Sequence, residues 1–230
     1  MELSTEEKSK LFIESAAADL NENDANSALA HLRQAQDLKN ESPELYYLLS
    51  LAYYRKHETE MAISAAKKAL KLSPDFSAAK NALGKLLLDK GDLVGAEKNL
   101  KEAALDLTYP EAFLSKTNLG LLNSKKKNQT EAEHWYTKAI FDAGNNACMA
   151  LYYRGEIYFQ KNLLEQAQSD FKRASKNGCA NFGEAHLYLG KTLIKMKKNS
   201  EAKAKLIEIQ QIFPSTDVAS RANQYLKEIQ

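Results

Sequence analysis

Apolar residues recur every three or four positions along most of the chain, which is the spacing of one face of an α-helix. The stretch 43–76 shows this most clearly, in two successive sets of apolar positions: Tyr46, Leu49 and Tyr53, then Ala62, Ala66, Ala69 and Leu72. Turn-forming segments such as Ser73-Pro74-Asp75 and Lys90-Gly91-Asp92 separate the helical stretches. The pattern therefore predicts an all-α chain built from pairs of amphipathic helices.

Small residues repeat at a nearly constant interval. Six alanines are separated by 34, 34, 36, 35 and 35 residues: Ala28, Ala62, Ala96, Ala132, Ala167 and Ala202. In the last four repeats a glycine precedes the alanine by 12 positions, at Gly84, Gly120, Gly155 and Gly190. Small side chains allow two helices to approach closely, so we expect these residues where the helices of each hairpin cross. A repeat of about 34 residues with this spacing resembles the tetratricopeptide repeat.

This resemblance implies a right-handed superhelix, an α-solenoid of six helical hairpins followed by a capping helix. The predicted repeats span 9–42, 43–76, 77–110, 113–146, 148–181 and 183–216, with the capping helix at about 217–229. A single hairpin cannot bury its apolar face alone, so the core should form between stacked neighbours. We therefore expect one solenoid domain over residues 1–230.

Composition narrows the classes of function. Thirty-two Lys and Arg against thirty Asp and Glu give a net charge of +2, so no nucleic-acid partner is expected. No apolar run approaches the roughly 20 residues that cross a bilayer. The first residues, Met1 to Glu7, do not resemble a signal sequence.

The sequence lacks the constellations that carry catalysis or bind metals. His31, His57, His134 and His186 occupy unrelated repeat positions, and none has a ligand partner at metal-binding spacing. There is no phosphate-binding loop, nucleophile elbow or dinucleotide fingerprint. We therefore expect no catalytic residues, no metal and no cofactor, and a role in binding rather than catalysis.

The two cysteines lie at the two ends of the fifth repeat. Cys148 opens its first helix, and Cys179 follows the end of its second helix. An antiparallel hairpin brings these points together, so a disulfide is possible in an oxidising compartment. The favoured interpretation is a pair of half-buried thiols between repeats, because two cysteines alone do not make a disulfide framework.

The first helices should form the inner, concave wall of the solenoid, at positions 2, 5, 9 and 12 of each repeat. The apolar side chains expected to bind a partner there are Tyr47, Leu51, Tyr54, Leu88, Leu121, Tyr152, Phe159 and Leu187. Polar positions of the same wall include Asn81, Lys85, Glu156 and Lys191. A large exposed apolar surface usually marks a binding site, and aromatic residues dominate such sites. The alternative is that the assigned register is shifted by one residue, so that some of these side chains are core.

The turns inside the repeats are basic, as at Arg55-Lys56-His57, Lys125-Lys126-Lys127 and Lys197-Lys198. Such an edge could meet an anionic membrane or an acidic partner. The favoured interpretation is structural, because lysines complement helix dipoles and nearby glutamates neutralise them.

A narrower resemblance lies at the junction of repeats three and four. The segment Asp106-Leu107-Thr108-Tyr109-Pro110-Glu111, followed by Asn118-Leu119-Gly120-Leu121, is similar to that junction in type IV pilus pilotins. Two extra residues here should leave a gap that Tyr109 fills, while Pro110 starts the next helix. By contrast, the Lys and Asn clamp that holds a C-terminal carboxylate in chaperone-binding relatives is absent, since Tyr47, Leu51 and Ala82 occupy the corresponding positions.

The pilotin resemblance implies a lipoprotein at the periplasmic face of the outer membrane that helps the pilus secretin to assemble. The protein partner would then be a secretin or another pilus subunit, bound by a monomer, and only a lipid anchor would join the protein to the membrane. The lipid-bearing cysteine of such proteins is not among the residues near Met1. The alternative is a cytoplasmic adaptor for a signalling protein such as a small GTPase.

Overall fold

The computed structural model describes residues 3–39 and 41–229 and consists, over these ranges, of helices without β-strands. The helices form six hairpins and one final helix: α1 (Thr5–Asn21) and α2 (Ala25–Asp37), α3 (Pro43–Arg55) and α4 (Thr59–Leu72), α5 (Ser77–Lys90) and α6 (Leu93–Leu105), α7 (Ala112–Lys125) and α8 (Gln129–Ala143), α9 (Cys148–Gln160) and α10 (Leu164–Arg173), α11 (Gly183–Lys195) and α12 (Asn199–Ile212), and α13 (Asp217–Glu228). The predicted all-α fold of stacked hairpins is therefore confirmed.

Each predicted repeat contains one hairpin, but three local features differ from expectation. Helix α1 begins before residue 9, because the Ser4 side chain and Glu7 form a reciprocal capping box. Pro110 lies in a turn and precedes α7 by two residues instead of starting it. Short 3₁₀ helices, η1 (Gly144–Asn146) and η2 (Asn177–Cys179), follow α8 and α10.

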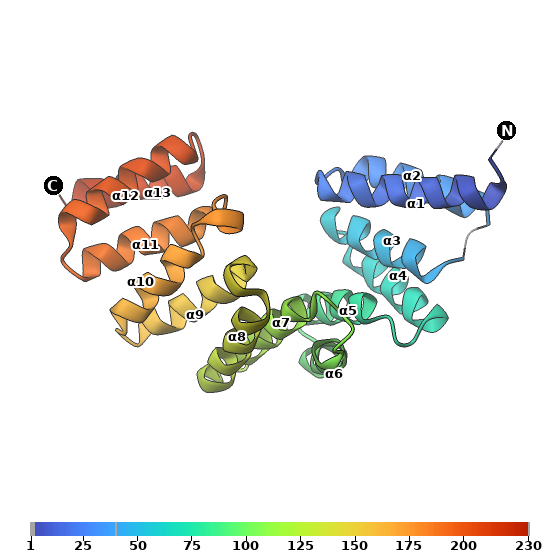
Figure 1. Ribbon diagram of the computed structural model, residues 1–230, viewed down its shortest axis with the longest axis horizontal. Coiled ribbons are helices and arrows are strands. Elements are labelled where there is room, and N and C mark those ends of the chain that lie inside the picture. Colours follow the sequence, from blue (N-terminus) through green and yellow to red (C-terminus); the bar gives the residue numbers. More distant parts are fainter. Residues whose placement is uncertain (1–2, 40, 230) are drawn as a thin grey trace. The chain divides into compact units, whose positions relative to one another are not determined.

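The chain forms two compact units, residues 1–118 and 119–230, whose boundary falls inside α7. In the first unit, hairpins α1–α2, α3–α4 and α5–α6 pack in sequence order (Figure 1). In the second unit, α9 to α13 pack in the same manner, and the first helices α9 and α11 also contact each other. The expectation of a single solenoid over residues 1–230 stays a prediction.

Every hairpin turns through one residue in the left-handed backbone conformation. These residues are Asn23, His57, Gly91, Lys127, Asn162 and Lys197, with φ values from 60° to 90°. The next residue often caps the second helix, as Asp92 does by accepting a hydrogen bond from the Gly95 N–H. The same turn therefore recurs although only one of the six positions is glycine.

The predicted glycines lie where the helices of a hairpin cross. Each faces a large buried side chain 16 positions later, in the pairs Gly84–Leu100, Gly120–Tyr136, Gly155–Phe171 and Gly190–Leu206. A Cβ on Gly84 would lie 2.6 Å from the Leu100 Cγ, and one on Gly155 would lie 2.8 Å from the Phe171 Cε1. No Cβ atom fits at these distances, so the crossing in these four hairpins requires glycine.

Lysines of the turns bind the second helix of the preceding repeat. Lys56 Nζ donates to Asn26 Oδ1 at 2.8 Å, and Lys90 Nζ lies 2.6 Å from Glu60 Oε1. In the second unit, Lys161 Nζ lies 2.6 Å from Glu133 Oε2. Surface pairs of this kind contribute at most about 1 kcal/mol each, but they support the structural interpretation of the basic turns.

We expect Gly155→Ala to destabilise the protein by about 1–3 kcal/mol, because the new methyl group collides with the Phe171 ring. Urea unfolding followed by helicity measures the change. Phe171→Leu removes the ring atoms nearest to the methyl group, so the two losses should be less than additive in the double variant. Strict additivity would contradict the proposed contact.

Candidate functional site

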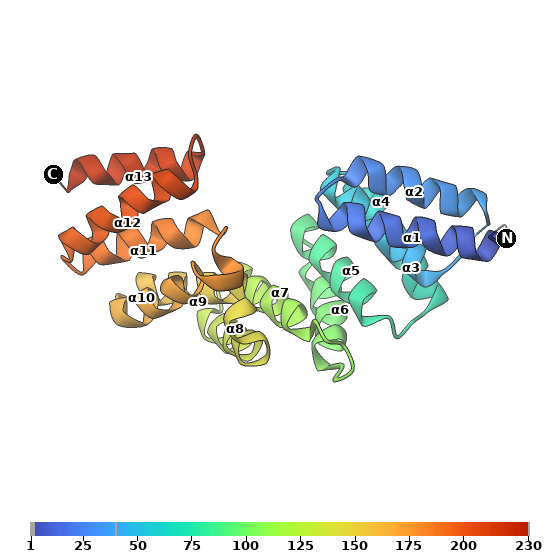
Figure 2. The same cartoon turned by 45° about the horizontal axis from the view of Figure 1, so that its top comes forward.

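The second unit carries a cluster of aromatic and charged side chains on its first helices and its last helix. We call it the C-terminal cluster; its members are Tyr152, Glu156, Phe159, Tyr188, Lys191, Lys195 and Tyr225. They project from α9, α11 and α13, which follow one another through the unit (Figure 2). The repeat therefore brings residues about 35 positions apart onto one surface.

Tyr152 forms the buried base of this cluster. Its ring centroid lies 5.0 Å from that of Phe182 and 5.3 Å from that of Tyr188, and 8% of its surface is exposed. The Phe159 ring lies 6.1 Å from Tyr188 in an edge-to-face arrangement. Phe159 and Tyr188 are half-buried, so part of each ring is open to a partner.

Two lysines of α11 cover these rings. Lys191 Nζ lies 4.1 Å from the centroid of Tyr188 and 5.8 Å from the centroids of Phe159 and Tyr225. Lys195 Nζ lies 4.7 Å from the centroid of Phe159. Attraction between an ammonium and a ring face holds both side chains against the cluster.

Glu156 is the carboxylate of the cluster, and it forms hydrogen bonds with the hydroxyls of Tyr152 and Tyr188. Burial raises the pKa of Glu156, while these hydrogen bonds and the charge of Lys191 act in the opposite direction. Burial likewise raises the pKa of Tyr152 and of Tyr188, and the nearby Glu156 charge adds to both shifts. The hydroxyls therefore stay protonated and serve as donors.

The first unit contains a second, smaller cluster around the repeat junction. Tyr109 forms hydrogen bonds with the side chains of Asn81 and Glu111. Tyr47 lies close enough to interact electrostatically with the Tyr109 hydroxyl. Burial is the main cause that raises the pKa of Tyr109. Asn118 Nδ2 donates to Asn81 Oδ1 at 3.0 Å. The junction tyrosine thus lies against Asn81 of α5. Its role in filling a gap between repeats three and four stays a prediction.

Asp106 fixes the start of this junction. It accepts hydrogen bonds from the Ser77 hydroxyl at 2.5 Å and from the Thr108 N–H at 2.8 Å. These bonds, that from Ser77 first, lower the pKa of Asp106. The Asp and Tyr of the junction motif therefore attach the segment to α5 at two points.

The other sequence-predicted residues of the first unit differ in how open they are. Tyr54 is 39% exposed, but its hydroxyl donates to Asp89 Oδ2 at 2.9 Å and accepts from Lys85. Tyr47 packs edge to face on Phe76, with centroids 5.2 Å apart. Leu51 is half-buried, as is Leu121 in the second unit.

Three predicted wall residues are instead part of the core. Leu88 is 1% exposed, Tyr152 8% and Leu187 0%, so the expectation that they line an open wall is wrong. Tyr152 and Leu187 each lie three residues before a crossing glycine, and Leu88 lies four residues after one. These spacings place a side chain on the glycine face of the helix, which packs against the second helix of the hairpin.

Sequence reasoning missed Tyr188, Tyr225 and Lys195 as members of the cluster. Tyr188 stands two residues before Gly190, on the opposite side of α11 from the crossing. Measuring the register from each glycine would have selected Tyr188 in place of Leu187. Tyr225 lies in the capping helix, outside the repeat pattern from which the wall was predicted.

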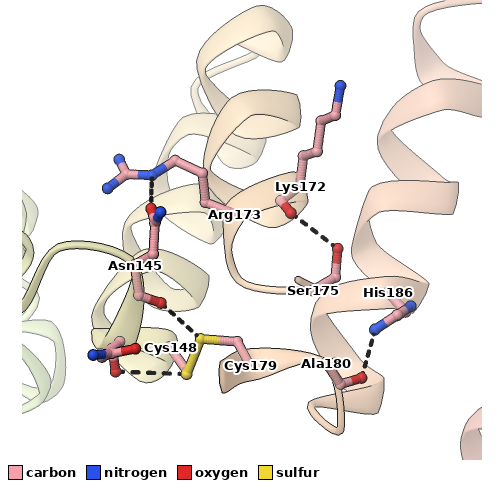
Figure 3. The surroundings of a disulfide bond; sticks show 9 residues. Asn145, Cys148, Lys172, Arg173, Ser175, Cys179, Ala180 and His186 are labelled. Carbon is pink, nitrogen blue, oxygen red and sulfur yellow. Dashed lines mark hydrogen bonds between the residues drawn. A yellow bond between two sulfur atoms is a disulfide. The ribbon is translucent and has the colours of Figure 1, made fainter. Parts of the chain in front are cut away.

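Figure 3 shows a disulfide between Cys148 and Cys179, whose Cα atoms lie 5.5 Å apart. The bond joins the first residue of α9 to η2, so the favoured interpretation of two separate thiols is wrong and the alternative, a disulfide that closes the hairpin, is confirmed. The Cys179 Sγ lies 3.1 Å from the backbone oxygen of Asn145, and Arg173 Nε donates to the Asn145 side chain at 3.1 Å. The bridge thus gathers η1, η2 and the end of α10 at the start of α9.

Within the residues that the structure describes, no group of three or more His, Cys, Asp or Glu side chains could hold a metal ion. None of the helices in these same ranges combines the length and the apolar character needed to cross a membrane.

Comparison with known proteins identifies the repeats. Residues 43–76 and 81–147 match family models described as tetratricopeptide repeat, so the chain carries such repeats. Type IV pilus assembly protein PilF of Pseudomonas aeruginosa is 22% identical over 206 residues, which cover 89% of this chain and 81% of that protein. TPR repeat-containing protein MJ1428 of Methanocaldococcus jannaschii is 28% identical over 138 residues, covering 60% of this chain but 24% of that longer protein.

Two solved structures resemble this one along nearly their full lengths. The structure of P. aeruginosa PilF has a TM-score of 0.76 at 17% identity and covers 97% of this chain and 99% of its own. PilW, described as a widely conserved type IV pilus biogenesis factor, has a TM-score of 0.74 at 16% identity and covers 92% and 96%. At these identities the likeness shows the fold, that of a tetratricopeptide solenoid similar to type IV pilus biogenesis factors.

Replacing both cysteines, as Cys148→Ser with Cys179→Ser, should lower the free energy of unfolding by about 2–4 kcal/mol, because the bridge closes a loop whose ends are 31 residues apart. Thermal unfolding with and without reductant measures the effect. Reductant should lower the stability of the wild type to that of the double variant and leave the variant unchanged. Equal stability of the wild type and the double variant in the absence of reductant would contradict the prediction.

Glu156→Gln should stabilise the protein more at neutral than at acid pH. Because the pKa of Glu156 is raised on folding, the folded state binds the proton more tightly. Stability therefore falls as pH rises from the ordinary glutamate value through the raised one, and a glutamine avoids this loss. Urea unfolding of both proteins at about pH 4 and about pH 7 tests the difference. If the difference in stability between the variant and the wild type is the same at both pH values, burial of the Glu156 charge is not the cause of that difference.

Proposed function

We propose that the protein is a non-enzymatic scaffold for type IV pilus biogenesis that assists the assembly of an outer-membrane secretin. The observation that carries the proposal is the similarity to PilF over 89% of the chain, which includes both compact units. The junction motif at Asp106 and Tyr109 supports it, because both residues hold that segment against α5.

We infer that the C-terminal cluster captures a segment of the secretin or of another pilus subunit. Half-exposed aromatic rings beside charged groups are the usual composition of a protein-binding hot spot. An amphipathic helix or an extended segment could lie across Phe159 and Tyr188. Tyr152 would act from below, by holding the Tyr188 ring at 5.3 Å.

The proposed location is the periplasmic face of the outer membrane, where the protein would act as a lipid-anchored monomer. The disulfide between Cys148 and Cys179 supports an oxidising compartment. The same bond argues against the alternative of a cytoplasmic signalling adaptor, in which these cysteines would be reduced.

Deleting the gene in its native host should abolish the heat-resistant multimers of the pilus secretin while the secretin monomer remains. The full-length protein should restore them, and the Phe159→Ala variant should not. An exposed aromatic hot-spot residue typically contributes about 2 kcal/mol, or roughly thirtyfold in affinity.

Phe141→Ala provides the matched control, because Phe141 is 89% exposed on α8 and lies outside the C-terminal cluster. It should restore the multimers fully. Normal secretin multimers in the deletion strain would overturn the proposed function. If Phe159→Ala restores the multimers, the C-terminal cluster does not bind the secretin.

A further inference from the structure

The lysines of the C-terminal cluster carry charge that the surrounding residues compensate only in part. Lys191 and Lys195 are one helical turn apart on α11, and both cover the Phe159 ring. Like charges at this spacing repel each other by a few tenths of a kcal/mol. An anion bound beside the two ammonium groups would offset this repulsion and so stabilise the arrangement.

The nearby carboxylates compensate the lysine charges only in part, because they also bind other side chains. Glu156 accepts hydrogen bonds from two tyrosines, and burial raises its pKa. Glu184 pairs with Arg221 at 2.6 Å. It also stands at the opposite end of α11 from Lys195, so that 11 residues, or about 16 Å along the axis, separate the two. That distance exceeds the Debye length of about 8–10 Å in physiological salt.

The way in which the lysines are held leaves their donors available. A ring face attracts an ammonium without accepting its N–H bonds one by one, and each ammonium has three donors. Lys195 uses one toward the backbone oxygen of Phe159 at 3.4 Å. Lys191 is half-buried and Lys195 exposed, so both can meet a ligand from the solvent side.

We propose that Lys191 and Lys195 form an anion-binding pair that selects an acidic segment of a protein partner. The carboxylates of that segment pair with the two ammonium groups, and an adjacent apolar side chain of the segment lies on the open parts of Phe159 and Tyr188. Both lysines belong to α11, and their ammonium groups lie over the rings of Tyr188 and Phe159. This inference rests on the proposed protein-binding role of the same cluster and adds the chemistry of the partner.

A pair of labelled peptides tests the proposal on the full chain by fluorescence anisotropy. One peptide alternates Phe with pairs of Glu, and the other carries Gln at every Glu. The wild type should bind the acidic peptide at least about tenfold more tightly, which is the usual contribution of a charge-assisted hydrogen bond. The preference should shrink when salt is raised from about 0.05 M to about 0.5 M.

The double variant Lys191→Gln with Lys195→Gln should lose this preference while it still binds both peptides weakly through the rings. Lys203→Gln with Lys227→Gln removes the same charge from exposed sites of α12 and α13 and should keep the preference. Thermal unfolding verifies that each variant is folded. Equal binding of the two peptides by the wild type, no binding of either, or a preference kept by Lys191→Gln with Lys195→Gln would overturn the inference.

These outcomes are separate from those of the secretin experiment. If deletion of the gene leaves secretin multimers intact but the acidic preference is found, the anion-binding pair stands and the proposed partner falls. If the multimers are lost but the two peptides bind equally, the scaffold role is supported and the proposal that the partner segment is acidic is wrong.

Discussion

The close crossing of the two helices in each hairpin is the constraint on which the rest of the structure depends. In four hairpins a glycine meets a buried Leu, Tyr or Phe that lies 16 residues later. In the first two hairpins the corresponding positions are Ala16 with Leu32 and Ser50 with Ala66, all of them fully buried. Because at least one member of each pair is small, the two helices can approach closely and pack without a void. The crossing fixes the rotation of the first helix about its axis.

That rotation decides which side chains reach the C-terminal cluster. On α11, Leu187 shares the face of Gly190 and is buried, whereas Tyr188 and Lys191 point away from the crossing and meet the rings of the C-terminal cluster. On α9, Tyr152 is drawn inward by the same geometry, and Phe159, in the last turn, stays half-exposed. The buried Tyr152 still belongs to the site, because its ring supports Tyr188 from below. The core and the C-terminal cluster therefore share one set of helices.

The period of the alanines was sufficient to place every hairpin, because an amphipathic repeat leaves few alternatives for where a turn can fall. The surface was harder to predict. A wall assigned from fixed repeat positions ignored the glycine register, so it included Leu88 and Leu187 and omitted Tyr188. Tyr225 could not be found from the repeat at all, since it belongs to the capping helix. The left-handed residues Lys127 and Lys197 also escaped notice, because lysine, unlike Gly or Asn, does not favour this conformation.

The bond between Cys148 and Cys179 encloses all of α9 and α10, which is one complete hairpin. If the chain is pulled from its ends, force passes through the two sulfurs and does not reach the enclosed residues. At about 3.3–3.6 Å per extended residue, a loop with ends 31 positions apart withholds about 100 Å of contour length from stretching. Since Phe159 lies within this loop and Tyr188 outside it, tension on the oxidised protein can extend the chain around Tyr188 but not around Phe159, so it would separate the two halves of the C-terminal cluster.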